Sequence, residues 1–160
     1  MSINEKLVKL FDATNFVVTR QADGLTHEES LVQLPFRSNC FNWVLGHIVM
    51  GRDRALEALG SNPLYSDEQR QRYGTGSEPI TPENQAMTLE ALLAGMDKSR
   101  EAIAAALEST SEAALAKVWN EESGQTVEDR IRGLHWHETY HSGQLEILRQ
   151  AAGKDDRILG

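Results

Sequence analysis

The segment TVEDRIRGLHWHETYHSGQLEILRQAAG, residues 126–153, carries the strongest structural signal in the chain. Thr126 and Asp129 have the spacing of a capping box, and Gly153 stands where a helix would end. Between these limits, apolar residues recur at helical spacing and form one stripe: Val127, Ile131, Leu134, Leu145, Leu148 and Ala152. The pattern predicts one long amphipathic helix that packs against other helices.

Two earlier segments repeat this helical period. The first covers residues 3–22, and the second runs from about residue 39 to Leu59. Ser38 or Asn39 can serve as the N-cap of the second segment, and Gly60 follows its last apolar residue as a C-terminal stop. We therefore expect two further long helices in this part of the chain.

A fourth helix is predicted in the middle of the chain. Thr81-Pro82-Glu83 combines an N-cap residue, a proline at the first helical position and an acid in the first turn. Apolar residues at helical spacing then continue to about Ser109. The alternating pattern of strands is almost absent. The sequence thus predicts an all-α fold, a four-helix bundle with long connecting loops, as a single domain over residues 1–160.

The connection over residues 61–80 is long and polar, and contains two prolines and two glycines. One helical turn is expected within it, at Asp67–Arg72. Long ordered loops often cover or shape a site, so this segment is either a lid or a plain surface connection. Residues 25–38 and 110–125 are expected to connect the other helices.

The composition describes an ordinary folded protein of 160 residues, 40% hydrophobic and 25% charged. The net charge of −8 disfavours binding to nucleic acid or to an anionic membrane surface, because both require clusters of Lys and Arg. The first residues lack a basic and apolar leader, and no apolar run is long enough to cross a bilayer. The single cysteine allows no internal disulfide. We therefore expect a cytoplasmic protein.

Two histidines lie four residues apart in the last predicted helix. His137 and His141 share one helix face, about 6 Å apart, which allows two imidazoles to bind one divalent ion. His141 falls within the apolar stripe and His137 at its edge, so both need a polar partner inside the bundle. A lone histidine there would be a hydrogen-bonded core residue, whereas a pair at ligand spacing favours a metal. His135 lies roughly on the opposite side of the helix and cannot share their ion.

The second predicted helix supplies a further candidate ligand, His47. Its apolar neighbours at helical spacing are Trp43, Val44 and Met50. These neighbours indicate that His47 faces the interior, and Gly46 would let another helix come close. With His137 and His141, it would complete a three-histidine site with open coordination positions. Such sites are typical of catalytic rather than structural metal centres.

The motif Asn42-Trp43-x-x-Gly46-His47-Ile48, followed by His137-x-x-x-His141-x-Gly143-Gln144-x-x-x-Leu148-Arg149, resembles the DinB-like superfamily. The resemblance covers essentially the whole chain. It implies a four-helix bundle, commonly a homodimer, in which His47, His137 and His141 hold one divalent metal ion. Nickel or zinc is the usual ion in proteins of this superfamily.

The same resemblance implies a function. Characterised members include transferases and isomerases that use a low-molecular-weight thiol, so it implies a metal-dependent transferase or hydrolase with a small-molecule substrate, such a thiol among the candidates. Two alternatives stay open. One is a non-catalytic, stress-related module that binds a metal or ligand, and the other is a metal-free interaction protein whose histidines form only hydrogen bonds.

His137-Glu138-x-x-His141 also matches the zinc-metallopeptidase signature, in which the glutamate is the general base. The extended form of that signature requires Gly and His where this chain has Gln144 and Ile147. A downstream glutamate ligand would have to be Glu146, on the same helix. The predicted fold also offers no sheet edge to align a peptide. The peptidase is therefore the weaker hypothesis.

Three polar residues beside the histidine pair are candidates for further roles. Glu138 either orients a ligand imidazole or acts as a base near bound water, or it is a core-edge carboxylate paired with an arginine or a backbone donor. Tyr140 either aims its hydroxyl at the site or packs against neighbours. Gln144 forms a hydrogen bond either to a ligand imidazole or between helices.

Three other polar residues are expected to lie outside the chemistry. Cys40 precedes His47 by seven residues, about 10 Å along a helix, and is expected to be buried rather than a ligand. Asn42 is expected to fix the start or the packing of its helix. His27 lies in a polar connection and is expected to be solvated.

Overall fold

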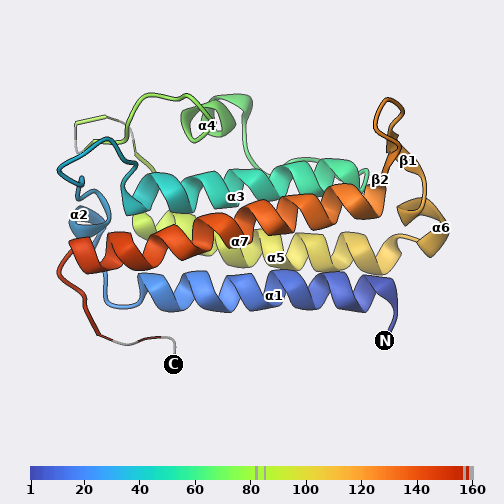
Figure 1. Cartoon of the computed structure of the whole chain (residues 1–160), viewed down its shortest axis with the longest axis horizontal. Helices are drawn as coiled ribbons and strands as arrows, with labels where there is room; N and C mark the ends of the chain where they lie inside the picture. Colours follow the sequence, from blue (N-terminus) through green and yellow to red (C-terminus); the bar gives the residue numbers. More distant parts are fainter. Residues whose placement is uncertain (82, 85, 157, 159–160) are drawn as a thin grey trace.

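The computed structural model describes residues 1–81, 83–84, 86–156 and 158. Four long helices lie side by side in it (Figure 1). Their bounds are α1 Ile3–Ala22, α3 Phe41–Ala58, α5 Leu89–Ser109 and α7 Val127–Ala151. The predicted all-α fold with a four-helix bundle is confirmed. Within the described residues, no helix is both long and apolar enough to span a membrane.

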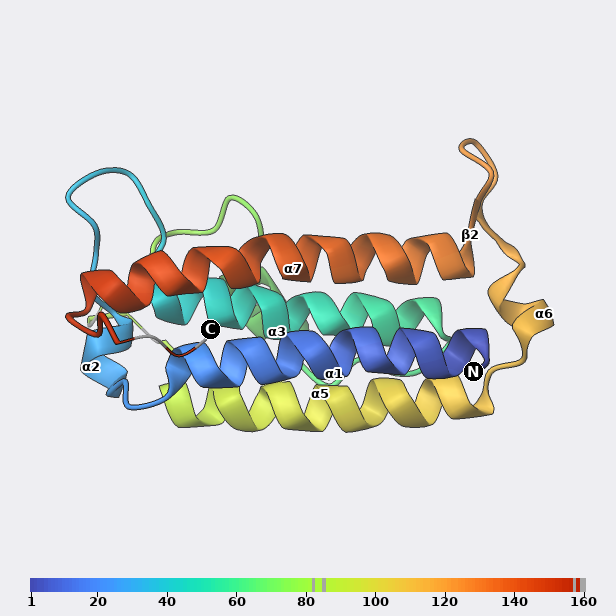
Figure 2. The ribbon, with the colours of Figure 1, turned by 60° about the horizontal axis from the view of Figure 1, so that its bottom comes forward.

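The four long helices form a ring in cross-section. α3 packs against α5 and α7, and α1 packs against the same two helices, so α1 and α3 are diagonally opposite. α1 and α7 run in one direction along the bundle, and α3 and α5 run in the other (Figures 1 and 2). The helices that carry the candidate histidines, α3 and α7, are therefore antiparallel neighbours.

The length of the connection between α3 and α5 follows from this arrangement. Because the two helices run in the same direction, the chain must return along the bundle between them, as it does along the outside of α3 in Figure 1. The expected helical turn is present there as α4 (Asp67–Arg72). Tyr73 and Ile80 anchor the segment, each 1% exposed, and the Asp53 carboxylate accepts two of its backbone N–H groups at 2.9 and 3.1 Å.

Short elements fill the remaining connections. α2 (His27–Ser30) lies between α1 and α3, and α6 (Glu112–Leu115) follows α5. A two-stranded antiparallel hairpin of β1 (Val118–Asn120) and β2 (Gln125–Thr126) leads into α7, with an irregular register. The sequence predicts only a polar connection here, since strands this short carry no alternating pattern.

The predicted ends of α7 are confirmed. The Thr126 hydroxyl accepts the Asp129 N–H at 3.1 Å, and the Asp129 carboxylate accepts the Thr126 N–H at 3.0 Å, which completes the capping box. The helix ends at Ala151, two residues before Gly153, whose φ of 86° few other residues adopt readily.

The start predicted at Thr81-Pro82-Glu83 for the helix in the middle of the chain, α5, is wrong. α5 begins at Leu89, and Thr88 is its N-cap, with a hydroxyl that accepts the Ala91 N–H at 3.1 Å. Pro82 lies outside the described residues. Around Thr81 the chain forms a turn instead, in which Asn84 Oδ1 accepts the Thr81 N–H at 2.9 Å. Local cap signals misplace the helix because the burial of Ile80 and other tertiary contacts fix this segment against α3.

The predicted N-cap of α3 is also wrong by one or two residues. Cys40, not Ser38 or Asn39, occupies the N-cap position, and its side chain makes no capping hydrogen bond. Cys40 is 1% exposed and its thiol lies 3.8 Å from the Ile80 carbonyl oxygen. The helix therefore starts inside the core, where burial rather than a polar cap determines its first residue.

α3 is the central element of the core. It is covered by α5, by α7 and by the returning segment, so it is buried on nearly every side. Its buried residues include four polar side chains, those of Asn42, His47, Arg52 and Asp53. Because buried polar groups need hydrogen-bond partners, each of these four side chains marks a specific polar contact inside the core.

Candidate metal centre

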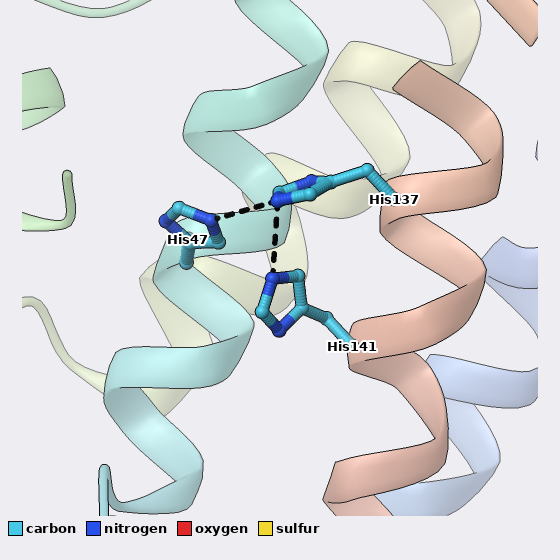
Figure 3. A group of neighbouring side chains, drawn as sticks. All are labelled: His47, His137 and His141. Carbon is cyan, nitrogen blue, oxygen red and sulfur yellow. Dashed lines mark hydrogen bonds between the residues drawn. The ribbon is translucent and has the colours of Figure 1, made fainter. Parts of the chain in front are cut away.

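The three predicted ligands lie together between α3 and α7. His47 projects from α3, and His137 and His141 project from α7 toward it (Figure 3). The Nε2 atom of His137 lies 3.4 Å from that of His47 and 3.1 Å from that of His141. The cluster is half-buried, with His47 the most enclosed at 5% exposure.

The spacing of these nitrogens fits one metal ion. One ligand atom from each histidine lies within 4.8 Å of the others. Two nitrogens that each bind an ion at about 2.0–2.1 Å are about 2.8–3.4 Å apart, for bond angles between octahedral and tetrahedral. The two separations from His137 fall within this range, and all three nitrogens lie within 4.8 Å of one another, so the three imidazoles could hold one divalent ion.

The loop around Tyr73 fixes the orientation of His47. The Nδ1–H of His47 donates to the Tyr73 carbonyl oxygen at 2.7 Å, which leaves Nε2 as a lone-pair donor toward His137. The Trp43 ring stacks on the His47 ring, nearly parallel to it and with centroids 4.8 Å apart. A side chain on Gly46 would overlap the Tyr73 ring. The close approach expected at Gly46 is therefore made by a side chain of the returning segment, not by another helix.

Gln144 orients His141 in the same way. Its Oε1 atom accepts the Nδ1–H of His141 at 2.6 Å, so the Nε2 atom of His141 also presents a lone pair to the cluster. Lone pairs of two neutral imidazoles repel unless a proton or a cation lies between them. The two Nδ1 hydrogen bonds thus prepare the cluster for a cation.

Burial and neighbouring positive charge keep the imidazoles of His47 and His137 neutral. Burial lowers the pKa of His47 to about 4, and the hydrogen bond to Tyr73 only partly opposes this shift. Burial also lowers the pKa of His137, and His141 beside it acts in the same direction. The Arg54 guanidinium contributes to both shifts. Neutral imidazole is the form that binds a metal, so the site is ready for one at neutral pH.

Glu138 points into the bundle core, where it is 4% exposed. Its two oxygens accept hydrogen bonds from Arg52, at 2.6 Å from Nη2 and 3.0 Å from Nε, and the Thr14 hydroxyl donates to one of them. Of the roles considered from the sequence, the structure shows the carboxylate paired with an arginine. Both oxygens are engaged, which argues against a general base of the peptidase type. Ile147, where the extended peptidase signature has its third histidine, is 61% exposed.

Tyr140 lies on the outer surface of α7 and is 58% exposed. Its ring meets the His141 ring edge-on, with centroids 5.1 Å apart, and lies 6.1 Å from the ring of Trp136. It therefore packs beside a candidate ligand, and a role for its hydroxyl in chemistry stays a prediction.

The remaining candidates stand apart from the cluster. His135 lies 3.1 Å from the Leu10 carbonyl oxygen, on the α1 side of α7, as its position on the helix predicts. Cys40 is buried, which raises the pKa of its thiol. His27 is not fully solvated as expected, because its Nδ1 accepts the Leu89 N–H at 3.3 Å. None of these three residues joins His47, His137 and His141.

Two residues that shape the site were missed in the sequence. Tyr73 supplies the carbonyl that orients His47, and its hydroxyl donates to Asn42 Oδ1 at 3.1 Å, consistent with the packing role expected for Asn42. Arg52 supplies the partner of Glu138. An arginine within the apolar run of α3 was a usable signal, whereas nothing in the sequence of a polar loop marks Tyr73 as a neighbour of His47.

Comparisons with known proteins agree with this architecture. A structural match is the "Crystal structure of the conserved protein of locus from Enterococcus faecalis", with a TM-score of 0.73 and 18% sequence identity, covering 95% of this chain and 98% of that chain. At this identity the likeness concerns the fold. No curated protein matches the chain. The family model of the DinB superfamily matches residues 11–145, which include all three histidines. The chain therefore belongs to the DinB superfamily.

Proposed function

We propose that this protein binds one divalent metal ion, nickel or zinc, through His47, His137 and His141, and that it is a metal-dependent transferase or hydrolase. One observation carries the proposal. Hydrogen bonds from Nδ1 of His47 and of His141, to the Tyr73 carbonyl and the Gln144 amide oxygen, direct both Nε2 lone pairs to the position of the third imidazole. Hydrogen bonding among the histidines alone would not require both acceptors in these positions.

Catalysis is favoured over a purely structural ion for two reasons. Three protein ligands leave at least one coordination position for water or substrate. The bundle also has its own extensive core, so folding has little need of a metal staple. A divalent ion held by the three histidines would lower the pKa of a coordinated water or thiol toward neutrality. The thiol itself is proposed from the family resemblance, with a small electrophile as the second substrate.

Cobalt provides a spectroscopic test of this function. Protein loaded with Co²⁺ should develop a thiolate-to-cobalt charge-transfer band when 2-mercaptoethanol is added. His141→Ala should abolish the band, whereas His135→Ala, a histidine of the same helix outside the cluster, should keep it. Chelation should remove the band while the protein stays folded by circular dichroism. Cobalt bound without any response to thiol would refute thiol activation, and unfolding on chelation would indicate a structural ion.

A further inference from the structure

A small cavity adjoins two of the three histidines. Its volume is about 30 Å³, and its wall includes His47 and His137, together with Tyr73 and three arginines, Arg52, Arg54 and Arg70. A space of this size exceeds the volume that one water needs, so it can admit a group of a few atoms. The candidate metal centre thus has an adjoining pocket into which part of a substrate would fit.

Arg54 brings a positive charge to this pocket. It follows His47 by seven residues on α3, which places it on the same helix face about 10 Å further along the axis. Within the part of the chain that the structure describes, Arg54 forms no ion pair. By contrast, Arg20, Arg100 and Arg132 each pair with an acid. Three other described arginines also form no ion pair, but Arg54 is the one of these four that lines the pocket.

Arg70 also lines the pocket, but its charge is already paired. Its two terminal nitrogens pair with Glu57 and Asp67 on the outside of the protein. Its Nε–H has no hydrogen-bond partner among the described residues, but it is buried, so a ligand in the pocket does not reach it. Arg70 therefore shapes the wall without offering a free donor to a ligand.

Of the three arginines that line the pocket, one keeps a charge that no acid among the described residues pairs. Glu138 engages Arg52, and Glu57 and Asp67 engage Arg70. Arg54 is therefore the lining residue whose charge is free to attract a small anion.

We propose that Arg54 binds the carboxylate of a small anionic substrate whose reacting group faces the three histidines. The planar guanidinium can hold both oxygens of a carboxylate, which fixes the direction of the molecule as well as its charge. The position of the reacting group rests on the proposed function, whereas the anion site depends on Arg54 alone. The substrate class is a small carboxylic acid with a thiol or another reactive group a few bonds from the carboxylate.

Calorimetric titration with two matched probes tests the proposal. The probes are 3-mercaptopropionate and its neutral amide, each added to zinc-loaded protein and to metal-free protein. Wild-type protein should bind the acid about tenfold or more tightly than the amide in both forms, since a charge-assisted hydrogen bond contributes that much. Arg54→Gln should lose this preference and bind the amide as before. Because Arg54 is exposed and has no internal ion pair, this variant should melt at the wild-type temperature.

A second variant controls for general charge effects. Arg20→Gln removes an exposed arginine at the end of α1 and should keep the wild-type preference. A metal-free wild type that binds acid and amide equally would contradict the anion site, as would an equal loss in Arg20→Gln and Arg54→Gln. If zinc fails to bind but the metal-free protein still prefers the acid, the proposed function fails and the anion site stands.

Discussion

At the scale of single residues, Arg52 links more of the long helices by hydrogen bonds than any histidine of the candidate site does. Its guanidinium donates to the Glu138 carboxylate, to Asn15 Oδ1, to the Met96 carbonyl and to the Ser99 hydroxyl, and these partners come from the three other long helices. The ion pair itself adds little net stability, because both charges leave water. Removing one partner is costly, since it leaves the other charge alone in the core.

Glu138→Gln is therefore expected to destabilise the protein by about 3–5 kcal/mol, with the loss measured by urea unfolding. The matched control is Glu128→Gln on the same helix, whose carboxylate accepts from Arg132 at 2.7 Å at the surface. That change should cost less than about 1 kcal/mol. A Glu138→Gln protein as stable as the control would contradict the structural role and restore Glu138 as a candidate base.

The site residues differ in how far the sequence reveals them. His137 and His141 follow from spacing within one helix, and His47 follows from its apolar neighbours. Tyr73 could not be predicted, because its carbonyl reaches His47 across a contact between segments 26 residues apart. The pocket position of Arg54 was hidden for the same reason, since it depends on how the returning segment packs against α3.

At the scale of elements, the start of α5 offers a direct check. Thr88→Ala should destabilise the protein by about 1 kcal/mol, because its hydroxyl caps the helix. Thr81→Ala, at the start expected from the sequence, should change the free energy of unfolding by no more than a few tenths of that amount. Chemical denaturation of both variants measures the difference. A larger effect at Thr81 than at Thr88 would contradict the observed boundary.

The predicted boundaries succeed or fail according to what determines them. The ends of α7 depend on local hydrogen bonds between Thr126 and Asp129, which the sequence displays. The starts of α3 and α5 depend on burial of Cys40 and Ile80, which are distant in the chain and meet only in the fold. Local signals therefore predict the existence of each helix better than its first residue.

At the scale of the whole molecule, the bundle and its returning segment enclose His47 between the Tyr73 carbonyl, the Trp43 indole and α7. Its low pKa means that the unfolded chain binds a proton between pH 6.5 and about 4 that the folded protein does not. Stability from this neutral histidine is thus fully present above pH 6.5 and is lost as the pH falls toward 4.

The homodimer implied by the family resemblance and the cytoplasmic location expected from the sequence stay predictions.

The metal-free protein should accordingly lose about 2 kcal/mol of unfolding free energy between pH 7 and pH 5 through His47. Urea unfolding at the two values, in the presence of chelator, measures this loss. His47→Gln should flatten the pH dependence by that amount. An equally steep dependence in the variant would show that His47 is not held neutral in the folded protein.

The most direct test of the three-histidine centre is the metal content of protein purified without a histidine tag. Wild type and His135→Ala should contain about one nickel or zinc ion per chain after incubation with either metal. His47→Ala, on α3, and His137→Ala, on α7, should each contain none while remaining folded. Absence of metal from the wild type, or retention of a full equivalent in either ligand variant, would contradict a site shared between the two helices.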